Sequence, residues 1–221
     1  MTKHVNKAYI QFIGNASSDV TGSAYRVKFG SSDVLLECGM IQDGRDIYSL
    51  YQANKRFMDS FYIKGLTCSI APHGNHNDHM GLYPALFRKG YKGSVFIPEG
   101  NKKFLEIMWA DSLKIMESDS IKIEKKWNKP APPLFNEKDI ATALEHLIEI
   151  PYNYPIHLSD ELIFEFLPSG HIINSASVLM TLKNSRGDTK RIYYSSDIGA
   201  AINHHYVVPR QTPRQFDIGI V

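Results

Sequence analysis

Four side chains able to bind a metal ion lie within seven consecutive residues of this 221-residue chain. The segment HGNHNDH (73–79) carries three histidines and one aspartate, and its other residues are small or polar. Imidazole nitrogen and carboxylate oxygen suit Zn²⁺ and related divalent ions, and a tight loop can direct alternate side chains at two neighbouring ions. The spacing therefore predicts a metal-binding loop formed by His73, His76, Asp78 and His79.

Two further candidate ligands stand alone in later turns. His171 lies in PSGHIINSAS (168–177) and Asp197 lies in YYSSDIG (193–199), each after a hydrophobic run typical of a strand. A lone histidine in a turn is more often a surface residue than a ligand, and Asp near Gly commonly only makes a turn. Each of these two signals is ambiguous by itself.

Short runs rich in β-branched and aromatic residues predict the strands that would position these loops. LTCSI (66–70) is expected to be a buried strand that leads directly into the histidine-rich segment. Strands at both ends of the chain with helices between them favour a layered α/β sandwich made of one domain. The predicted strands span 7–13, 24–29, 33–37, 66–70, 94–98, 161–167, 177–182, 191–196 and 216–221.

Helical periodicity predicts helices over 47–59, 82–89, 101–117 and 137–146, with the last two packed on the outer face of a sheet. Within 101–117 the apolar residues at helical spacing are Phe104, Ile107, Met108 and Ile115. The lysine- and proline-rich segment 118–136 around Trp127 is expected to be irregular. RNA contact is one reading of this segment, and a solvated surface loop with a half-buried tryptophan is the favoured one.

Composition excludes some classes of function. The formal net charge of +2 gives no strong basic excess, so charge alone does not indicate a nucleic-acid partner. Two cysteines are too few for a disulfide framework, which favours a reducing, cytoplasmic location. No stretch has the apolar length of a signal peptide or a membrane span, so no membrane association is expected.

As a set, these motifs resemble the metallo-β-lactamase superfamily, in which an HxHxDH loop, a later His and a later Asp supply the metal ligands. GNASSDVTGSAYRV (14–27) and VLLECGMIQ (34–42) look like the opening of the β-CASP ribonucleases, relatives of the pre-mRNA 3′-end cleavage endonuclease. The turns GHIINSAS (170–177) and YSSDIG (194–199) are similar to further motifs of the same branch. The resemblance covers nearly the whole chain.

The resemblance implies a four-layered αββα metallo-β-lactamase sandwich, incomplete in this chain, with residues 1–221 as its amino-terminal portion. It implies that His76 and His171 bind one metal ion, that Asp78 and His79 bind a second, and that Asp197 contacts both. Asp78 would also be catalytic by orienting the attacking water. Two divalent ions are expected, with Zn²⁺ favoured over Mn²⁺.

The chain departs from the family pattern beside the proposed ligands. The family's first histidine falls on Gly74 here, and the available imidazole is His73, one residue earlier. Either a local bulge lets His73 reach the metal, or the first site lacks a ligand. Glu37 replaces a family aspartate that orients a ligand, while Asn174 and Ser196 each replace a glycine with an expected minor effect.

The expected reaction is hydrolysis of a phosphodiester bond in single-stranded RNA. The family's cap domain and its later histidines do not lie in these 221 residues, so weak or no activity is expected of this chain. Alternatives are a non-catalytic binding module with a decayed metal site, and another hydrolase of this fold acting on a thioester or lactone. Endonuclease or exonuclease mode, RNA sequence preference and oligomeric state, including a homodimer, stay open.

Overall fold

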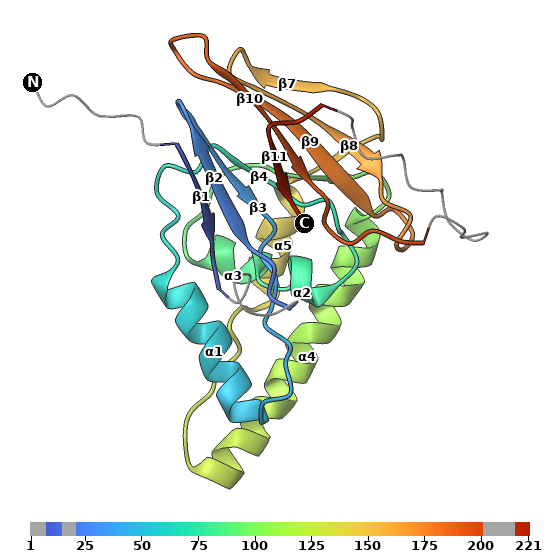
Figure 1. Ribbon diagram of the computed structural model, residues 1–221. Coiled ribbons are helices and arrows are strands. Elements are labelled where there is room, and N and C mark those ends of the chain that lie inside the picture. Colours follow the sequence, from blue (N-terminus) through green and yellow to red (C-terminus); the bar gives the residue numbers. More distant parts are fainter. Residues whose placement is uncertain (1–7, 15–20, 201–214) are drawn as a thin grey trace, which may run out of the picture.

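Two β-sheets pack face to face in the computed structural model, which describes residues 8–14, 21–200 and 215–221 (Figure 1). The first sheet, sheet A, has its strands in sequence order, antiparallel from β1 to β3 and parallel from β3 to β6. Its strands are β1 (Tyr9–Phe12), β2 (Tyr25–Phe29), β3 (Ser32–Leu36), β4 (Cys68–Ile70), β5 (Val95–Pro98) and β6 (Leu147–Ile150).

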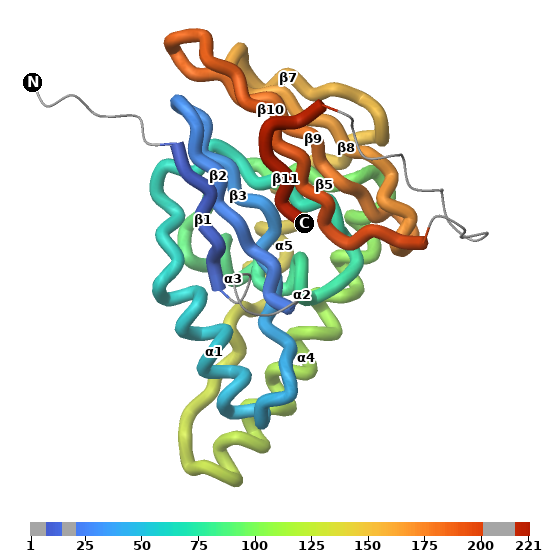
Figure 2. Tube along the Cα trace, viewed as in Figure 1, coloured from blue at the N-terminus to red at the C-terminus, as the bar shows by residue number. Residues whose placement is uncertain are grey.

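The second sheet, sheet B, is formed by the last third of the chain in the order β11-β10-β9-β8-β7. Its pairs are antiparallel except for β10 and β11, which run parallel, so the C-terminal strand lies beside β10 (Figure 2). The strands are β7 (Ile156–Ser159), β8 (Leu162–Pro168), β9 (Ala176–Lys183), β10 (Thr189–Tyr194) and β11 (Ile218–Ile220).

The helices cover the face of sheet A that is turned away from sheet B (Figure 1). Side chains alternate along a strand, so in β5 Val95 and Ile97 face the helices while Phe96 faces sheet B. Among the described residues no helix covers the outer face of sheet B, so three of the four expected layers are present. The helices are α1 (Ile47–Ser60), α2 (Asn77–Met80), α3 (Tyr83–Arg88), α4 (Lys102–Trp127) and α5 (Glu137–Glu145).

The α/β sandwich expected from the sequence is confirmed, and the long helix α4 corrects two details. The segment 118–127, expected to be irregular, continues α4 as far as Trp127, whose ring stacks on Tyr48. The apolar stripe was also assigned mostly to the wrong face, since of its four residues only Met108 packs against the core. Phe104, Ile107 and Ile115 are 43%, 62% and 53% exposed, and the side buried against the core carries Leu105, Trp109 and Leu113 instead.

Sequence patterns missed three short elements, namely α2, β6 and β7. Cys38 and Cys68 are both free and buried, in agreement with the absence of a disulfide framework. None of the helices among the described residues combines the length and the apolar character that crossing a membrane requires.

Candidate metal centre

The histidine-rich segment leaves β4 after Ile70 and enters the short helix α2. Three of its carbonyl groups accept backbone hydrogen bonds from residues 37 to 55 positions earlier in the chain, so the motifs 14–27 and 34–42 both hold the loop. A Cβ at Gly39 would lie 1.6 Å from the Asp78 carbonyl oxygen, and only glycine fits there. The bonds run from Ser23 N to Asp78 O (2.9 Å), from Cys38 N to His79 O (3.0 Å) and from Met40 N to Asn77 O (2.7 Å).

The opening motif that resembles the β-CASP pattern is only partly visible. Residues 15–20 of the motif 14–27 lie outside the described residues, and Ser23 within it makes the backbone bond to the Asp78 carbonyl.

The turns that carry His171 and Asp197 pack directly on one another and on this loop. Gly199 N donates to Ser169 O at 2.9 Å, and a Cβ at Gly199 would lie 1.9 Å from the carbonyl oxygen of Gly170. Ala176 N donates to the carbonyl of Pro72, just before the histidine-rich segment. Close backbone contacts therefore bring the ends of β4, β8 and β10 to one place.

Four of the predicted residues form one cluster. His73, His76, His171 and Asp197 each offer one ligand atom, and these atoms all lie within 4.8 Å of one another. The ring centroids of His73 and His76 are 4.6 Å apart, and Asp197 Oδ2 is 3.4 Å from His171 Nε2. His73 is buried and the other three are half-buried, so the cluster is accessible from solvent on one side.

His79 and Asp78 adjoin this cluster, and the ring centroid of His79 lies 4.3 Å from that of His73. The Nε2 atom of His79 is 3.4 Å from Asp197 Oδ2 and 3.8 Å from Asp78 Oδ2. Its Nδ1 atom lies 2.7 Å from Oε2 of the fully buried Glu37. All six predicted ligands and Glu37 thus lie in one region, with Asp197 between His79 and His171; their roles as ligands stay predictions.

The titratable groups of the cluster shift one another's pKa values. Burial, and next the electrostatic effects of His79 and His76, lower the pKa of His73 to about 2, so this imidazole stays neutral. Burial alone would lower the pKa of His79, but the negative charge of Glu37 and hydrogen bonds to Asp197 and Glu37 outweigh it and raise the pKa to about 10. The hydrogen bond from His79 lowers the pKa of Asp197 to about 2.

The residue at the shifted position has a distinct environment. Both ring nitrogens of His73 are buried without a hydrogen-bond partner among the described residues. At Gly74, where the family pattern has histidine, a Cβ would lie 2.4 Å from Cγ of Asn101, at the start of α4. The Asn101 amide is held in place by bonds to the carbonyls of Pro98 and Asn174. Asn101 therefore fills the space that a side chain at position 74 would need.

Sequence reasoning missed Asn101 as a neighbour of the site. The only signal was an asparagine as the first residue of a predicted helix, which indicates a helix start and says nothing about what the side chain packs against. The three departures Glu37, Asn174 and Ser196 all adopt positive φ, at 61°, 56° and 47°. Asn tolerates this conformation, while Glu and Ser need support from their surroundings.

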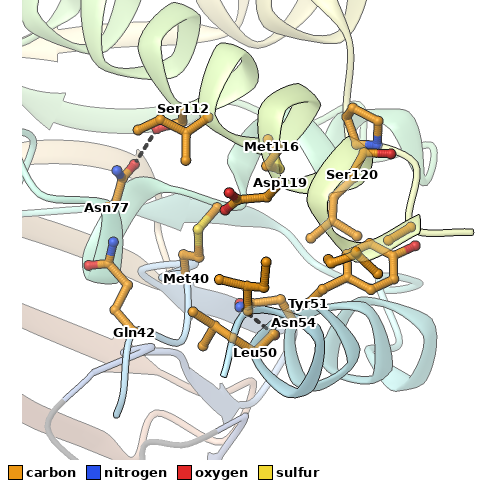
Figure 3. Close-up of a pocket in the computed structure, with 16 residues that line it drawn as sticks. Met40, Gln42, Leu50, Tyr51, Asn54, Asn77, Ser112, Met116, Asp119 and Ser120 are labelled. Carbon is orange, nitrogen blue, oxygen red and sulfur yellow. Dashed lines mark hydrogen bonds between the residues drawn. The ribbon is translucent and has the colours of Figure 1, made fainter. Parts of the chain in front are cut away.

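An apolar cavity of about 160 Å³ lies between α1 and α4 (Figure 3). Asn77, which separates His76 from Asp78 in the loop, lines this cavity, and its Oδ1 accepts a hydrogen bond from Ser112 of α4. On the side of the cavity, α4 therefore holds the loop through the side chain of Asn77.

The chain is similar in sequence to proteins that act on RNA or transcription. It is 32% identical over 184 residues to a ribonuclease of Thermus thermophilus, covering 83% of this chain and 36% of the relative. A probable RNase of Methanocaldococcus jannaschii is 30% identical over 184 residues, covering 83% and 37%. The transcription termination factor FttA of the same archaeon is 30% identical over 168 residues, covering 76% and 24%.

The chain thus spans about a third of the length of the curated ribonucleases that it matches. No family model matches it. Among solved structures, a subclass B3 metallo-β-lactamase of Bradyrhizobium japonicum aligns with a TM-score of 0.49 at 17% identity, covering 92% of this chain and 65% of that one. By its motifs and its sequence relatives, the chain belongs to the metallo-β-lactamase superfamily and is related to the β-CASP ribonuclease branch over the part that it spans.

Proposed function

We propose that this chain is the metal-binding part of a metal-dependent phosphodiesterase that cleaves single-stranded RNA. The observation that carries the proposal is the convergence of His73, His76, His171 and Asp197, from three separate turns, with ligand atoms within 4.8 Å. A mixed nitrogen and oxygen donor set of this kind suits Zn²⁺ and also accepts Mn²⁺. The ribonuclease names of the sequence relatives support RNA as the substrate.

In this proposal two ions share the site. His73, His76 and His171 would hold one ion, Asp78 and His79 the other, and Asp197 would contact both because it lies 3.4 Å from both His79 and His171. Divalent ions bound there would supply Lewis-acid stabilisation of the phosphate oxygens and a nucleophile derived from water at neutral pH. The carboxylate of Asp78, beside Nε2 of His79, would orient that nucleophile.

The environment of His73 supports the first of the two alternatives for the shifted ligand. A buried imidazole without a hydrogen-bond partner costs free energy unless something binds its nitrogens, and a metal ion would do so. Its low pKa keeps the ring in the neutral form that binds metals. Because Asn101 fills the space beside Gly74, the ligand at the neighbouring position, His73, takes over the first site.

We further propose that residues 1–221 form one metallo-β-lactamase domain with low activity by itself. The relatives are more than twice as long as this chain, and cleavage also needs a surface that binds RNA and a group that protonates the leaving oxygen. A cytoplasmic protein is expected, and a homodimer is one oligomeric state that fits.

A non-catalytic binding module is the second candidate function, favoured by the displacement of the first histidine to His73. Metal content separates the two functions. Purified chain dialysed against Zn²⁺ should retain about two ions per chain if it is the enzyme domain, and none if the site has decayed. The variant Asp197→Ala should lose at least one ion, while Asp160→Ala, at an exposed position in the turn before β8, should lose none.

The substrate class needs a separate assay. Single-stranded RNA and a thioester should each be offered to the metal-loaded chain and to the protein read from the gene's full reading frame. Cleavage of RNA that disappears in Asp197→Ala supports the proposal. Hydrolysis of the thioester without RNA cleavage would contradict it.

A further inference from the structure

Both oxygens of the Glu37 carboxylate are held by side chains from the end of β10. Glu37 Oε2 accepts a hydrogen bond from the Tyr194 hydroxyl at 2.5 Å, and Oε1 accepts one from the Ser196 hydroxyl at 2.8 Å. Oε2 also lies 2.7 Å from His79 Nδ1. Glu37 and Tyr194 are buried, so this carboxylate depends on these three partners in place of water.

These contacts close a ring through the candidate metal centre. From Glu37 the ring passes to His79 Nδ1, and from His79 Nε2 it passes over 3.4 Å to Asp197 Oδ2. Asp197 follows Ser196 directly in the chain, and Ser196 returns to Glu37 through its hydroxyl group. The ring therefore joins the histidine-rich loop to the turn that carries Asp197, although more than 100 residues separate them.

Ser196 has a strained backbone conformation that its hydroxyl group helps to stabilise. Its φ of 47° is a conformation that residues with a Cβ rarely adopt, and the bond to Glu37 helps to hold it there. Burial, and next the negative charge of Glu37, raises the pKa of Tyr194 well above its usual value, so the phenol stays protonated and donates to the carboxylate. Because the Glu37 carboxylate accepts hydrogen bonds from two hydroxyl groups, its orientation toward His79 is fixed.

We propose that Tyr194 and Ser196 are positioning residues that act through Glu37 to set the spacing of His79 and Asp197 for a divalent ion. The proposal rests on the metal-binding function proposed above. With Nδ1 of His79 donating to Glu37, its Nε2 atom is the one that faces Asp197, and an ion bound there would replace the Nε2 proton. Ser196 fixes the backbone from which Asp197 projects, and Tyr194 fixes the carboxylate.

The test is a titration of metal-free protein with Co²⁺, followed by its visible absorption, for the unaltered chain and three variants. Ser196→Gly removes the hydroxyl but suits the positive φ, so folding should be preserved or improved. Tyr194→Phe removes only the other hydroxyl. The matched control is Tyr193→Phe, since Tyr193 lies next in the same strand, is also buried, and donates to Ser177 at 3.2 Å instead of to Glu37.

We expect Ser196→Gly and Tyr194→Phe to weaken Co²⁺ binding by about 10-fold to 100-fold, the usual effect of losing a partner behind a ligand, and to change the absorption spectrum. Tyr193→Phe should leave both unchanged. Denaturant midpoints in EDTA should show Ser196→Gly close to the unaltered chain in stability, because relief of the positive φ offsets the lost hydrogen bond, which separates positioning from folding.

The outcomes distinguish the two proposals. Unchanged Co²⁺ affinity and spectrum in both Ser196→Gly and Tyr194→Phe, with normal binding by the unaltered chain, would overturn this inference and leave the proposed function standing. If the unaltered chain binds no Co²⁺ and no Zn²⁺, the metal centre itself is wrong and both proposals fall.

Discussion

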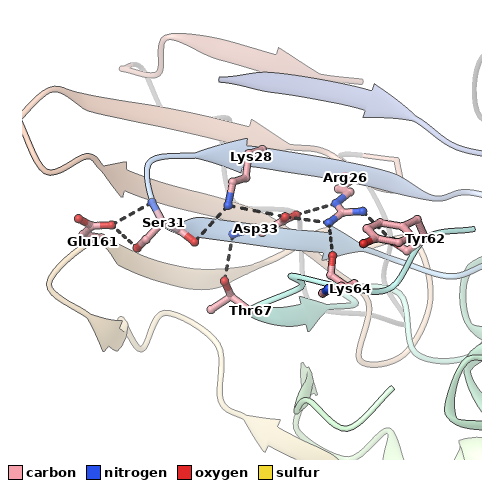
Figure 4. Close-up of polar contacts among 8 residues, drawn as sticks. All are labelled: Arg26, Lys28, Ser31, Asp33, Tyr62, Lys64, Thr67 and Glu161. Carbon is pink, nitrogen blue, oxygen red and sulfur yellow. Dashed lines mark hydrogen bonds and ion pairs between the residues drawn. The ribbon is translucent and has the colours of Figure 1, made fainter. Parts of the chain in front are cut away.

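The two ends of the central strands of sheet A each bury polar groups, but they treat them in opposite ways. Near the amino ends of β3 and β4, Asp33 of β3 accepts two hydrogen bonds, of 2.7 and 2.8 Å, from Arg26 of the antiparallel strand β2, and both residues are buried (Figure 4). The other guanidinium donors bond to the carbonyls of Tyr62 and Lys64. No polar side-chain atom of this ion pair is left buried without a partner in the described part of the chain.

At the carboxyl ends of the strands, buried polar atoms lack hydrogen-bond partners among the described residues. His73 is fully buried with two unpartnered nitrogens, and Asn101 beside it keeps an unpartnered Oδ1. A buried polar group without a partner costs about 1–3 kcal/mol, so a cluster of them persists only where it has another use. Arg26 and Asp33, with the carbonyls of Tyr62 and Lys64, hold the loop after α1 in place. The histidine cluster, in contrast, is arranged for a ligand that comes from outside the chain.

The largest expected effect is on the Arg26 side. Asp33→Ala would leave a buried guanidinium without its carboxylate, which should lower the free energy of unfolding by about 3–5 kcal/mol. Urea denaturation in EDTA measures this loss. At temperatures where the variant stays folded, the gain in stability from added Zn²⁺ should equal that of the unaltered chain.

Glu106→Ala is the matched control for this prediction. It also removes a carboxylate from an ion pair, with Lys103, but both groups are exposed, so no measurable change is expected. If Asp33→Ala were as harmless as this control, the ion pair would not be the structural element described above.

The next effect is that of metal itself. Because the histidine side is built for a ligand, Zn²⁺ at about 100 times its dissociation constant should raise the free energy of unfolding by about 2.7 kcal/mol for each site. Urea denaturation of the same protein in EDTA and in Zn²⁺ gives the difference. If the free energy of unfolding were the same in EDTA and in Zn²⁺, the contrast between the two ends of the strands would be wrong.

The sequence predicted most of the site because its signals are local. HGNHNDH (73–79) follows the hydrophobic run of β4, and the ends of parallel strands meet at one edge of a sheet, so a cluster there could be expected. The backbone bonds from residues 23 and 38–40 to this loop could not be predicted, since they depend on how the opening segments cross the sheet. Neither could the contact between Asn101 and Gly74, which joins residues from different elements.

The errors in the fold have similar causes. The irregular segment was placed too early because lysines after residue 120 suggested a loop, whereas they lie on the exposed side of α4 and prolines begin only at Pro130. The apolar stripe was assigned to Phe104 and Ile107 because several apolar sets share helical spacing in that segment. Trp109 and Leu113 form the buried set, and only packing distinguishes the two.

A smaller effect is expected from filling the space beside the shifted histidine. Gly74→Ala places a Cβ 2.4–2.6 Å from the side chain of Asn101, which should lower the free energy of unfolding by about 1–3 kcal/mol. Gly44→Ala is the control, because a Cβ at Gly44 would meet no atom within 4 Å, and it should leave the free energy of unfolding unchanged. If Gly74→Ala were neutral as well, Asn101 would not be what excludes a side chain from position 74.

The smallest change in the stability of the metal-free protein is expected for His73→Leu. This variant separates the two ends of the strands most clearly. Leucine has no polar atoms to leave unpartnered, so the free energy of unfolding in EDTA should stay within about 1 kcal/mol of the unaltered value or rise. The gain in stability on adding Zn²⁺ should fall, because one ligand is lost. This is the reverse of Asp33→Ala, which loses stability and keeps the gain. A His73→Leu protein that unfolds easily in EDTA and keeps the full Zn²⁺ gain would show that His73 packs the core like any other buried residue.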